Sequence, residues 1–236
     1  MRKIIRLFPL IGLSALLLSI SGCSQRISAL NDTIALAYYG NPDIVLTPEQ
    51  IKANPYASIY AKIEGASQVF ITLAFAEPKT YLNSTPTQSA PLELKWLSAD
   101  KAMLVTINGR LVKTHKLVQG NLVSVESTEP DPILLGLHLN NTPKQWTRTI
   151  DWQPGYHYGY TLNSQFKLVA EEVVMINESP KTTLHYSEFV SVDSLNIQYQ
   201  NEFWVDPKNG RVIKSWQKIA PNLPYIEMIL LKPFAS

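Results

Sequence analysis

Apolar and polar residues alternate with a period of two along most of the chain after residue 60. Because successive side chains of a strand point to opposite faces, this alternation indicates strands with one buried face. The apolar positions are rich in β-branched and aromatic residues, which favour strands. The pattern predicts strands over residues 69–75, 92–97, 103–107, 110–117, 156–162, 166–176, 182–190, 197–205 and 211–219.

Turn residues separate these runs. Asn108-Gly109 lies between two apolar segments and predicts a type I′ hairpin, whose two central residues need positive φ. The stretch from Asp206 to Gly210 contains Asn209-Gly210 and predicts a second hairpin of the same kind. Residues 76–91, with three prolines and a polar centre, predict a long surface loop.

Helices are predicted to be few and short. Thr47, Pro48 and Gln50 form a capping-box sequence, and Asn54-Pro55 ends that helix about two turns later. A similar start at Asp131-Pro132 predicts a helix through residue 137. Many antiparallel strands with little helix favour a mainly β fold, in which residues 41–236 form a single domain. Its sheet would be strongly curved, as a barrel or half-barrel, because closure removes exposed edges.

The N-terminus has the layout of a signal peptide: three basic residues by position 6, then an apolar run over residues 7–20. The run ends in Ile20-Ser21-Gly22-Cys23, which resembles a bacterial lipobox. We therefore predict cleavage of residues 1–22, lipidation of Cys23 by acyl chains such as palmitate, and a short tether over residues 23–40 containing a helix. The alternatives are a free thiol beside an ordinary cleavage site and a membrane-spanning anchor, for which the run is short of the roughly 20 residues required.

The formal net charge that bears on binding partners is that of the chain after this cleavage. Residues 1–22 contain three of the 21 basic residues and none of the 19 acidic ones, so their removal changes the formal net charge from +2 to −1. No basic field remains to neutralise phosphates, and nucleic-acid partners are not expected. Ser24, in place of aspartate after the cysteine, resembles the signal for the outer membrane. The predicted location is that membrane, facing the periplasm.

No catalytic or metal-binding motif is evident. The four histidines show no metal-ligand spacing, and no nucleophile motif or phosphate loop occurs, so we expect no enzyme, metal or cofactor. The pair of carboxylates that cleaves a glycosidic bond has no sequence signature, so five acidic residues remain candidates for that catalytic role. The more common interpretation is that they are exposed, solvated acids. These acids are Asp131, Asp151, Glu171, Glu172 and Glu188.

The richest cluster of aromatic residues spans residues 146–160. Aromatic rings can stack on sugars while polar neighbours bind hydroxyl groups, which gives a candidate glycan site of Trp146, Arg148, Asp151, Trp152, Tyr156 and Tyr158. The competing interpretation, which we favour, is packing in a barrel core, because Trp146 and Trp152, and then Tyr156, Tyr158 and Tyr160, each share one face of an extended segment. Trp96, Trp204 and Trp216 are expected in the core as well.

Six short segments are distributed along almost the whole mature chain: PDIVLTPEQI at 42–51, PYASI at 55–59, NGR at 108–110, DWQPG at 151–155, YGY at 158–160 and FWVDP at 203–207. In this order, they resemble the YjbF/GfcB lipoprotein family. The resemblance implies a β-rich, barrel-like protein of exopolysaccharide or group 4 capsule production at the outer membrane. Of the family's residues, only Cys23 carries over with a defined role, as the lipidated residue.

Three functions then compete. The leading hypothesis is a non-enzymatic accessory factor in polysaccharide export or assembly, acting by glycan binding or by docking to secretion proteins, and it predicts an exposed aromatic groove or a large apolar patch. A carrier of lipids or lipoproteins predicts an apolar cavity. A glycan hydrolase predicts two inward carboxyl groups in a polar cleft.

Overall fold

The computed structural model describes residues 42–79 and 90–235. The chain divides into two units, residues 1–42 and 43–236, and all the helices and strands in the described ranges lie in the second. The predicted signal peptide, Cys23, the tether helix and the centre of the predicted 76–91 loop lie outside the described residues. None of the helices in the described ranges is long and apolar enough to cross a membrane.

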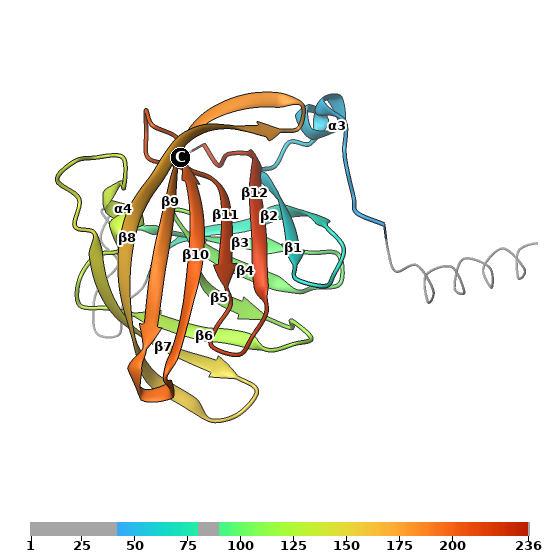
Figure 1. Ribbon diagram of the computed structural model, residues 1–236. Coiled ribbons are helices and arrows are strands. Elements are labelled where there is room, and N and C mark those ends of the chain that lie inside the picture. The colour runs from blue at the N-terminus through green and yellow to red at the C-terminus, as the bar shows by residue number, and fades with distance from the viewer. Residues whose placement is uncertain (1–41, 80–89, 236) are drawn as a thin grey trace, which may run out of the picture. The chain divides into compact units, whose positions relative to one another are not determined.

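Twelve strands form one antiparallel sheet in the described part of the chain (Figure 1). Every strand pairs with its sequence neighbours except that β5 does not pair with β6, and β1 pairs with β12, so the meander nearly closes into a barrel. The mainly β, barrel-like fold predicted from the sequence is therefore confirmed. The strands are β1 Ser58–Ile63, β2 Val69–Pro78, β3 Leu92–Leu97, β4 Met103–Ile107, β5 Arg110–His115, β6 Asn121–Glu126, β7 Gln145–Gln153, β8 His157–Ile176, β9 Ser179–Val192, β10 Ile197–Val205, β11 Val212–Lys218 and β12 Tyr225–Lys232.

The ladder is interrupted between β5 and β6, the two edges of the sheet. Side chains join them instead: Thr114 Oγ1 accepts from the Leu122 N–H at 3.0 Å, and Asn121 Oδ1 accepts from the Leu117 N–H at 3.0 Å. On the inner side, Gln217 of β11 accepts from the Leu111 N–H at 3.0 Å and donates to the Gly109 carbonyl at 2.8 Å. These contacts satisfy edge groups that would otherwise be unpaired.

All nine predicted ranges lie on observed strands, with bounds that shift by a few residues, but they correspond to eight strands, β2 to β5 and β8 to β11. Two of them, 156–162 and 166–176, are wrong as separate elements because β8 runs unbroken through the polar residues Asn163-Ser164-Gln165. The prediction also missed β1, β6, β7 and β12. In β7 the inward position between Trp146 and Ile150 holds Arg148, which disguises the alternation.

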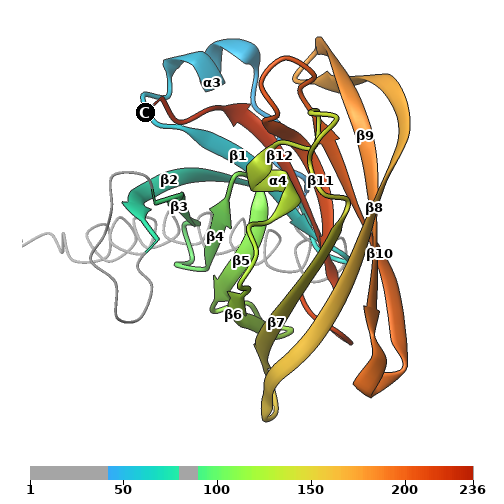
Figure 2. The same ribbon diagram turned by 90° about the vertical axis from the view of Figure 1, so that its left-hand side faces the viewer.

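The two predicted helices are present and short. Helix α3, Pro48–Ala53, has both hydrogen bonds of the capping box between Thr47 and Gln50. Helix α4, Pro132–Leu135, ends earlier than predicted because Gly136, at φ 92°, donates to the Ile133 carbonyl and stops the helix. A 3-10 turn, η1 Asp193–Leu195, joins β9 to β10. In both views of the barrel, α3 and α4 lie toward the same end (Figures 1 and 2).

The hairpin predicted at Asn108-Gly109 is confirmed, with φ values of 47° and 88°. The second predicted hairpin is present, since β10 pairs with β11, but its turn is not of type I′. Gly210 has positive φ and Asn209 does not, and Asp206 Oδ1 accepts from the Lys208 N–H in a longer loop. Another two-residue turn with two positive φ values lies at Asn177-Glu178, between β8 and β9.

Candidate functional site

Strand β7 separates the residues predicted to form one glycan site. Trp146, Arg148 and Trp152 point into the barrel and are 5%, 5% and 2% exposed, whereas Asp151 is half-buried on the outer side. Tyr156 and Tyr158 are 93% and 58% exposed. The six residues therefore do not share one surface, and the predicted site is wrong as a single constellation.

The competing core interpretation is correct only in part. Trp96, Trp146 and Trp152 are buried, and Trp152 stacks on His157 with 4.3 Å between ring centroids. Tyr156 and Tyr158, by contrast, are exposed because they lie at and just after the turn that joins β7 to β8.

Trp204 and Trp216 were also wrongly expected in the core, since both are half-buried. Trp204 is adjacent in its strand to the buried Phe203, and Trp216 to the buried Gln217. Because adjacent side chains of a strand point to opposite faces, both tryptophans face outward. Trp204 stacks on His185 and donates to Glu172, while Trp216 stacks on Tyr225 with 5.3 Å between centroids.

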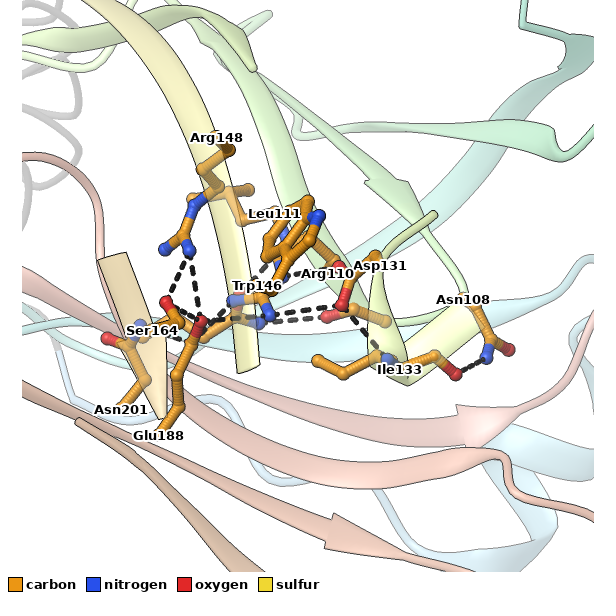
Figure 3. Close-up of polar contacts among 12 residues, drawn as sticks. Asn108, Arg110, Leu111, Asp131, Ile133, Trp146, Arg148, Ser164, Glu188 and Asn201 are labelled. Carbon is orange, nitrogen blue, oxygen red and sulfur yellow. Dashed lines mark hydrogen bonds and ion pairs between the residues drawn. The ribbon is translucent and has the colours of Figure 1, made fainter. Parts of the chain in front are cut away.

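A network of buried charges fills part of the barrel interior (Figure 3). Glu188, which is fully buried on β9, accepts from Arg110 at 2.6 and 3.2 Å and from Arg148 at 3.1 Å. Ser164 and Asn201 donate to the same carboxylate at 2.7 and 2.8 Å. Five hydrogen bonds thus compensate the cost of burying this charge.

The network extends to the end of the barrel at which α4 lies. Asp131 accepts from Arg110 Nε at 2.7 Å and also caps α4 by accepting from the Ile133 N–H at 2.9 Å. The Trp146 ring lies between the two arginines, with its centroid 5.0 Å from Arg110 Cζ and 4.6 Å from Arg148 Cζ. The cluster contains two arginines and two carboxylates, so its net charge is zero. The hydrogen bonds among these groups fix the positions of the side chains.

This pairing determines what the inward acids can do. Burial by itself would raise the pKa of Glu188, but the charges of Arg110 and Arg148 and the hydrogen bonds outweigh burial and lower the pKa to about 2. A general acid for glycoside cleavage needs a raised pKa instead. Glu188 therefore has the chemistry of a structural ion pair, and Asp131 is ion-paired with the same Arg110. The other candidate acids, Asp151, Glu171 and Glu172, are half-buried or exposed.

The outer face of β7 to β10 carries a grid of uncharged side chains in two rows, and all of them except Phe189 are polar. Pairing of the strands aligns Gln145, Gln165, Phe189 and Gln200 in one row. The second row is Thr147, Asn163, Ser191 and Gln198. From strand spacings, the grid is about 14 Å wide, with its rows about 7 Å apart.

A groove of about 480 Å³ lies over this grid, lined in part by Gln145, Asn163, Gln165, Gln198 and Phe189. Phe189 is 47% exposed, which is unusual for a phenylalanine, and the residues around it are polar. Within the grid, Gln145 donates to Gln165 at 3.2 Å and Thr147 donates to Asn163 at 3.1 Å. Because amides carry two donors and two acceptor sites, these contacts leave capacity for a ligand.

A second groove of about 350 Å³ adjoins the first, and Asn163 lines both. Tyr158, Tyr160, Thr161, Asp193 and Ser194 contribute to its walls. Among the residues that line the two grooves, Asp193 alone carries a full charge. Of the predicted glycan residues, Tyr158 thus lies beside a groove on the outer face, and Trp146 reaches the edge of the first groove from within.

Sequence reasoning missed most of this surface. Each row of the grid takes one residue from each of four strands, so the members of a row are far apart in the sequence. A signal was nevertheless present, since Phe189 alternates with the inward Glu188 and Val190 and so occupies the outward, polar phase of its strand.

The fold and site together define a twelve-stranded, nearly closed meander barrel with a packed, ion-paired interior and a polar, aromatic-containing outer groove. The model of a family described as group 4 capsule polysaccharide lipoprotein gfcB, YjbF matches residues 31–231. The chain belongs to this family, as its resemblance in sequence had indicated.

Two relatives from Escherichia coli (strain K12) support the assignment. The chain is 34% identical over 226 residues to the uncharacterized lipoprotein GfcB, covering 95% of this chain and 98% of the relative. It is 30% identical over 217 residues to the uncharacterized lipoprotein YjbF, covering 91% and 93%. The crystal structure of the hypothetical lipoprotein YmcC from Escherichia coli (K12) is similar, with a TM-score of 0.68, 32% identity, and coverage of 87% of this chain and 96% of that one.

Proposed function

We propose that this protein is a non-enzymatic accessory factor in capsule or exopolysaccharide production, and that it binds the polysaccharide through the outer groove of β7 to β10. Cys23 would carry the lipid that holds it at the outer membrane, facing the periplasm. The family's description as capsule polysaccharide lipoproteins supports the pathway. The observation that supports direct glycan binding is the exposed Phe189 within a grid of amides and hydroxyls.

The chemistry of the groove suits an uncharged sugar chain. Glutamine and asparagine side chains both donate and accept, as sugar hydroxyl groups do, and a groove built to bind hydroxyls discriminates against ligands that lack them. The flat face of Phe189 offers apolar area for the C–H face of a sugar ring. Arginine and lysine are absent from the residues that line both grooves, so the surface favours neutral sugars over acidic ones.

A direct test compares binding of the host's purified polysaccharide to the wild-type chain and to a Phe189→Ala variant, by affinity electrophoresis or calorimetry. Loss of a central aromatic contact should weaken binding about tenfold or more. Phe75→Ala is the matched control, because Phe75 is 59% exposed on β2, away from the groove, and its loss should leave binding unchanged. Equal affinities for all three proteins would contradict the glycan site.

A second test places the protein in its pathway. In the native host, Cys23→Ala should release the protein from the outer-membrane fraction and lower secreted polysaccharide. Unchanged secretion in that variant would argue against the pathway role. Reduced secretion in a strain lacking the protein, combined with no polysaccharide binding in vitro, would instead favour docking to secretion proteins.

A further inference from the structure

A separate cavity of about 300 Å³ opens at the other side of the barrel, between β3 and β4 on one wall and β11 and β12 on the other. Its deepest residues are buried and apolar: Ile59, Trp96, Ile107, Val212 and Met228. No residue of the outer groove lines it, so the two sites are independent.

The polar side chains in the cavity wall are already engaged. Thr106 Oγ1 accepts from Trp96 Nε1 at 2.9 Å, Asn108 donates to the Ile133 carbonyl at 2.7 Å, and Ser215 Oγ accepts from Gln217 at 2.9 Å. These contacts leave the wall with mainly apolar surface for an occupant. An apolar cavity of this kind binds hydrocarbon rather than water.

The mouth of the cavity has a different character. Leu134 of α4 is 39% exposed there, next to the exposed Pro233 and the half-buried Phe234. Arg211 also lines the mouth, is exposed, and forms no ion pair with any described carboxylate. A cation at the rim of an apolar cavity complements a ligand that has a hydrocarbon tail and an anionic head.

We propose that this cavity binds the single acyl chain of an anionic lipid, such as a fatty acid, with the head group at Arg211. The volume sets the length of the chain. A 150 Å³ apolar cavity holds one benzene molecule, so 300 Å³ corresponds to about a dozen carbon atoms. That is room for one chain and not for the several chains of a membrane lipid or a lipoprotein anchor.

The test uses the chain from residue 23 onward with Cys23→Ala, so that no acyl group of its own competes, and titrates it with saturated fatty acids of 8 to 16 carbons. Each added methylene should tighten binding about fourfold up to about 12 carbons, and further carbons should add little. An affinity that keeps rising in equal steps to 16 carbons would indicate nonspecific adsorption and overturn the proposal, as would no binding of laurate.

Variants locate the site. Leu94→Trp should fill the cavity and weaken laurate binding at least tenfold, while Leu97→Trp, on the outward face of the same strand, should not. Arg211→Ala should weaken binding of laurate but not of dodecanol, and this exposed position keeps the test decisive if Leu94→Trp misfolds. Equal laurate binding by Leu94→Trp, if that variant folds, or by Arg211→Ala would overturn the assignment.

The source of the lipid is tested with the natively lipidated chain. If that protein binds laurate as the Cys23→Ala chain does, the occupant comes from outside the molecule, as proposed. If lipidation blocks laurate binding, the cavity holds the protein's own acyl group and the proposal of an external lipid fails.

Discussion

Replacing Glu188 with glutamine tests the buried ion network directly. The substitution keeps the shape of the side chain but removes the negative charge that faces Arg110 and Arg148. Arg110 retains the carboxylate of Asp131, whereas Arg148 loses its carboxylate partner. The interior would then hold two positive charges against one negative charge.

The expected loss of stability follows from the burial of the group. Breaking a buried ion pair by removing one partner costs about 3–5 kcal/mol, because the remaining charge is uncompensated. The pKa of Glu188 gives a comparable figure: its change from 4.5 to about 2, at roughly 1.4 kcal/mol per pH unit, corresponds to about 3 kcal/mol. We therefore expect Glu188→Gln to lower the free energy of unfolding by about 3–5 kcal/mol at pH 7.

The pH dependence has a definite sign. Because the folded-state pKa of Glu188 lies below its unfolded value, its contribution is fully present above about pH 4.5 and is lost as the pH falls toward 2. The difference in stability between the wild-type protein and Glu188→Gln should therefore shrink between pH 5 and pH 2.

Urea unfolding followed by the fluorescence of the five tryptophans measures these differences. Glu171→Gln is the control, because Glu171 is exposed, and its stability should stay within about 0.5 kcal/mol of wild type. If Glu188→Gln lies within 1 kcal/mol of wild type with an unchanged denaturant slope, the network contributes no net stability and the reasoning is wrong.

Three further changes test other features. Gln217→Leu should destabilise by about 2–4 kcal/mol, since it leaves the N–H of Leu111 and the carbonyl of Gly109 unpaired at a buried edge, and urea unfolding measures this. Gly109→Ala should cost about 2–5 kcal/mol in the same assay, because φ is +88° and the new Cβ would lie 2.5 Å from Val212 Cβ. Thr47→Ala should remove about 1 kcal/mol of helix capping, detected as faster hydrogen exchange of the Gln50 N–H.

Local patterns predicted the elements of this fold well. Alternation located most strands, the capping box located α3, and Asn108-Gly109 located a turn, because each depends on residues adjacent in sequence. The closure of the barrel was also predictable, since an exposed sheet edge is unfavourable. Among the strands that were missed, β7 carries an inward arginine, Arg148, whose partner Glu188 lies 40 residues away in the chain.

The candidate sites could not be predicted for the same reason. Arg110 and Glu188 are 78 residues apart, and Glu188 alone resembles an ordinary acid on a strand. The outer grid depends on the register in which β7 to β10 pair. Irregularities in the pairing, at residues 150–152 and 168–170, shift this register by one residue. Register is a property of the assembled sheet, and no single segment encodes it.

The join between β5 and β6 has a consequence for the order of the chain. Since β1 pairs with β12, the first and last strands of the domain are neighbours in the sheet. In the described ranges, the sheet is interrupted between β5 and β6, which are consecutive in the chain and are connected by residues 116–120. A circular permutant that links the present ends and begins near Val118, which is 96% exposed, would order its strands as the sheet orders them. Every ladder would then join consecutive strands, and the longest-range pairing in the barrel would become a local one.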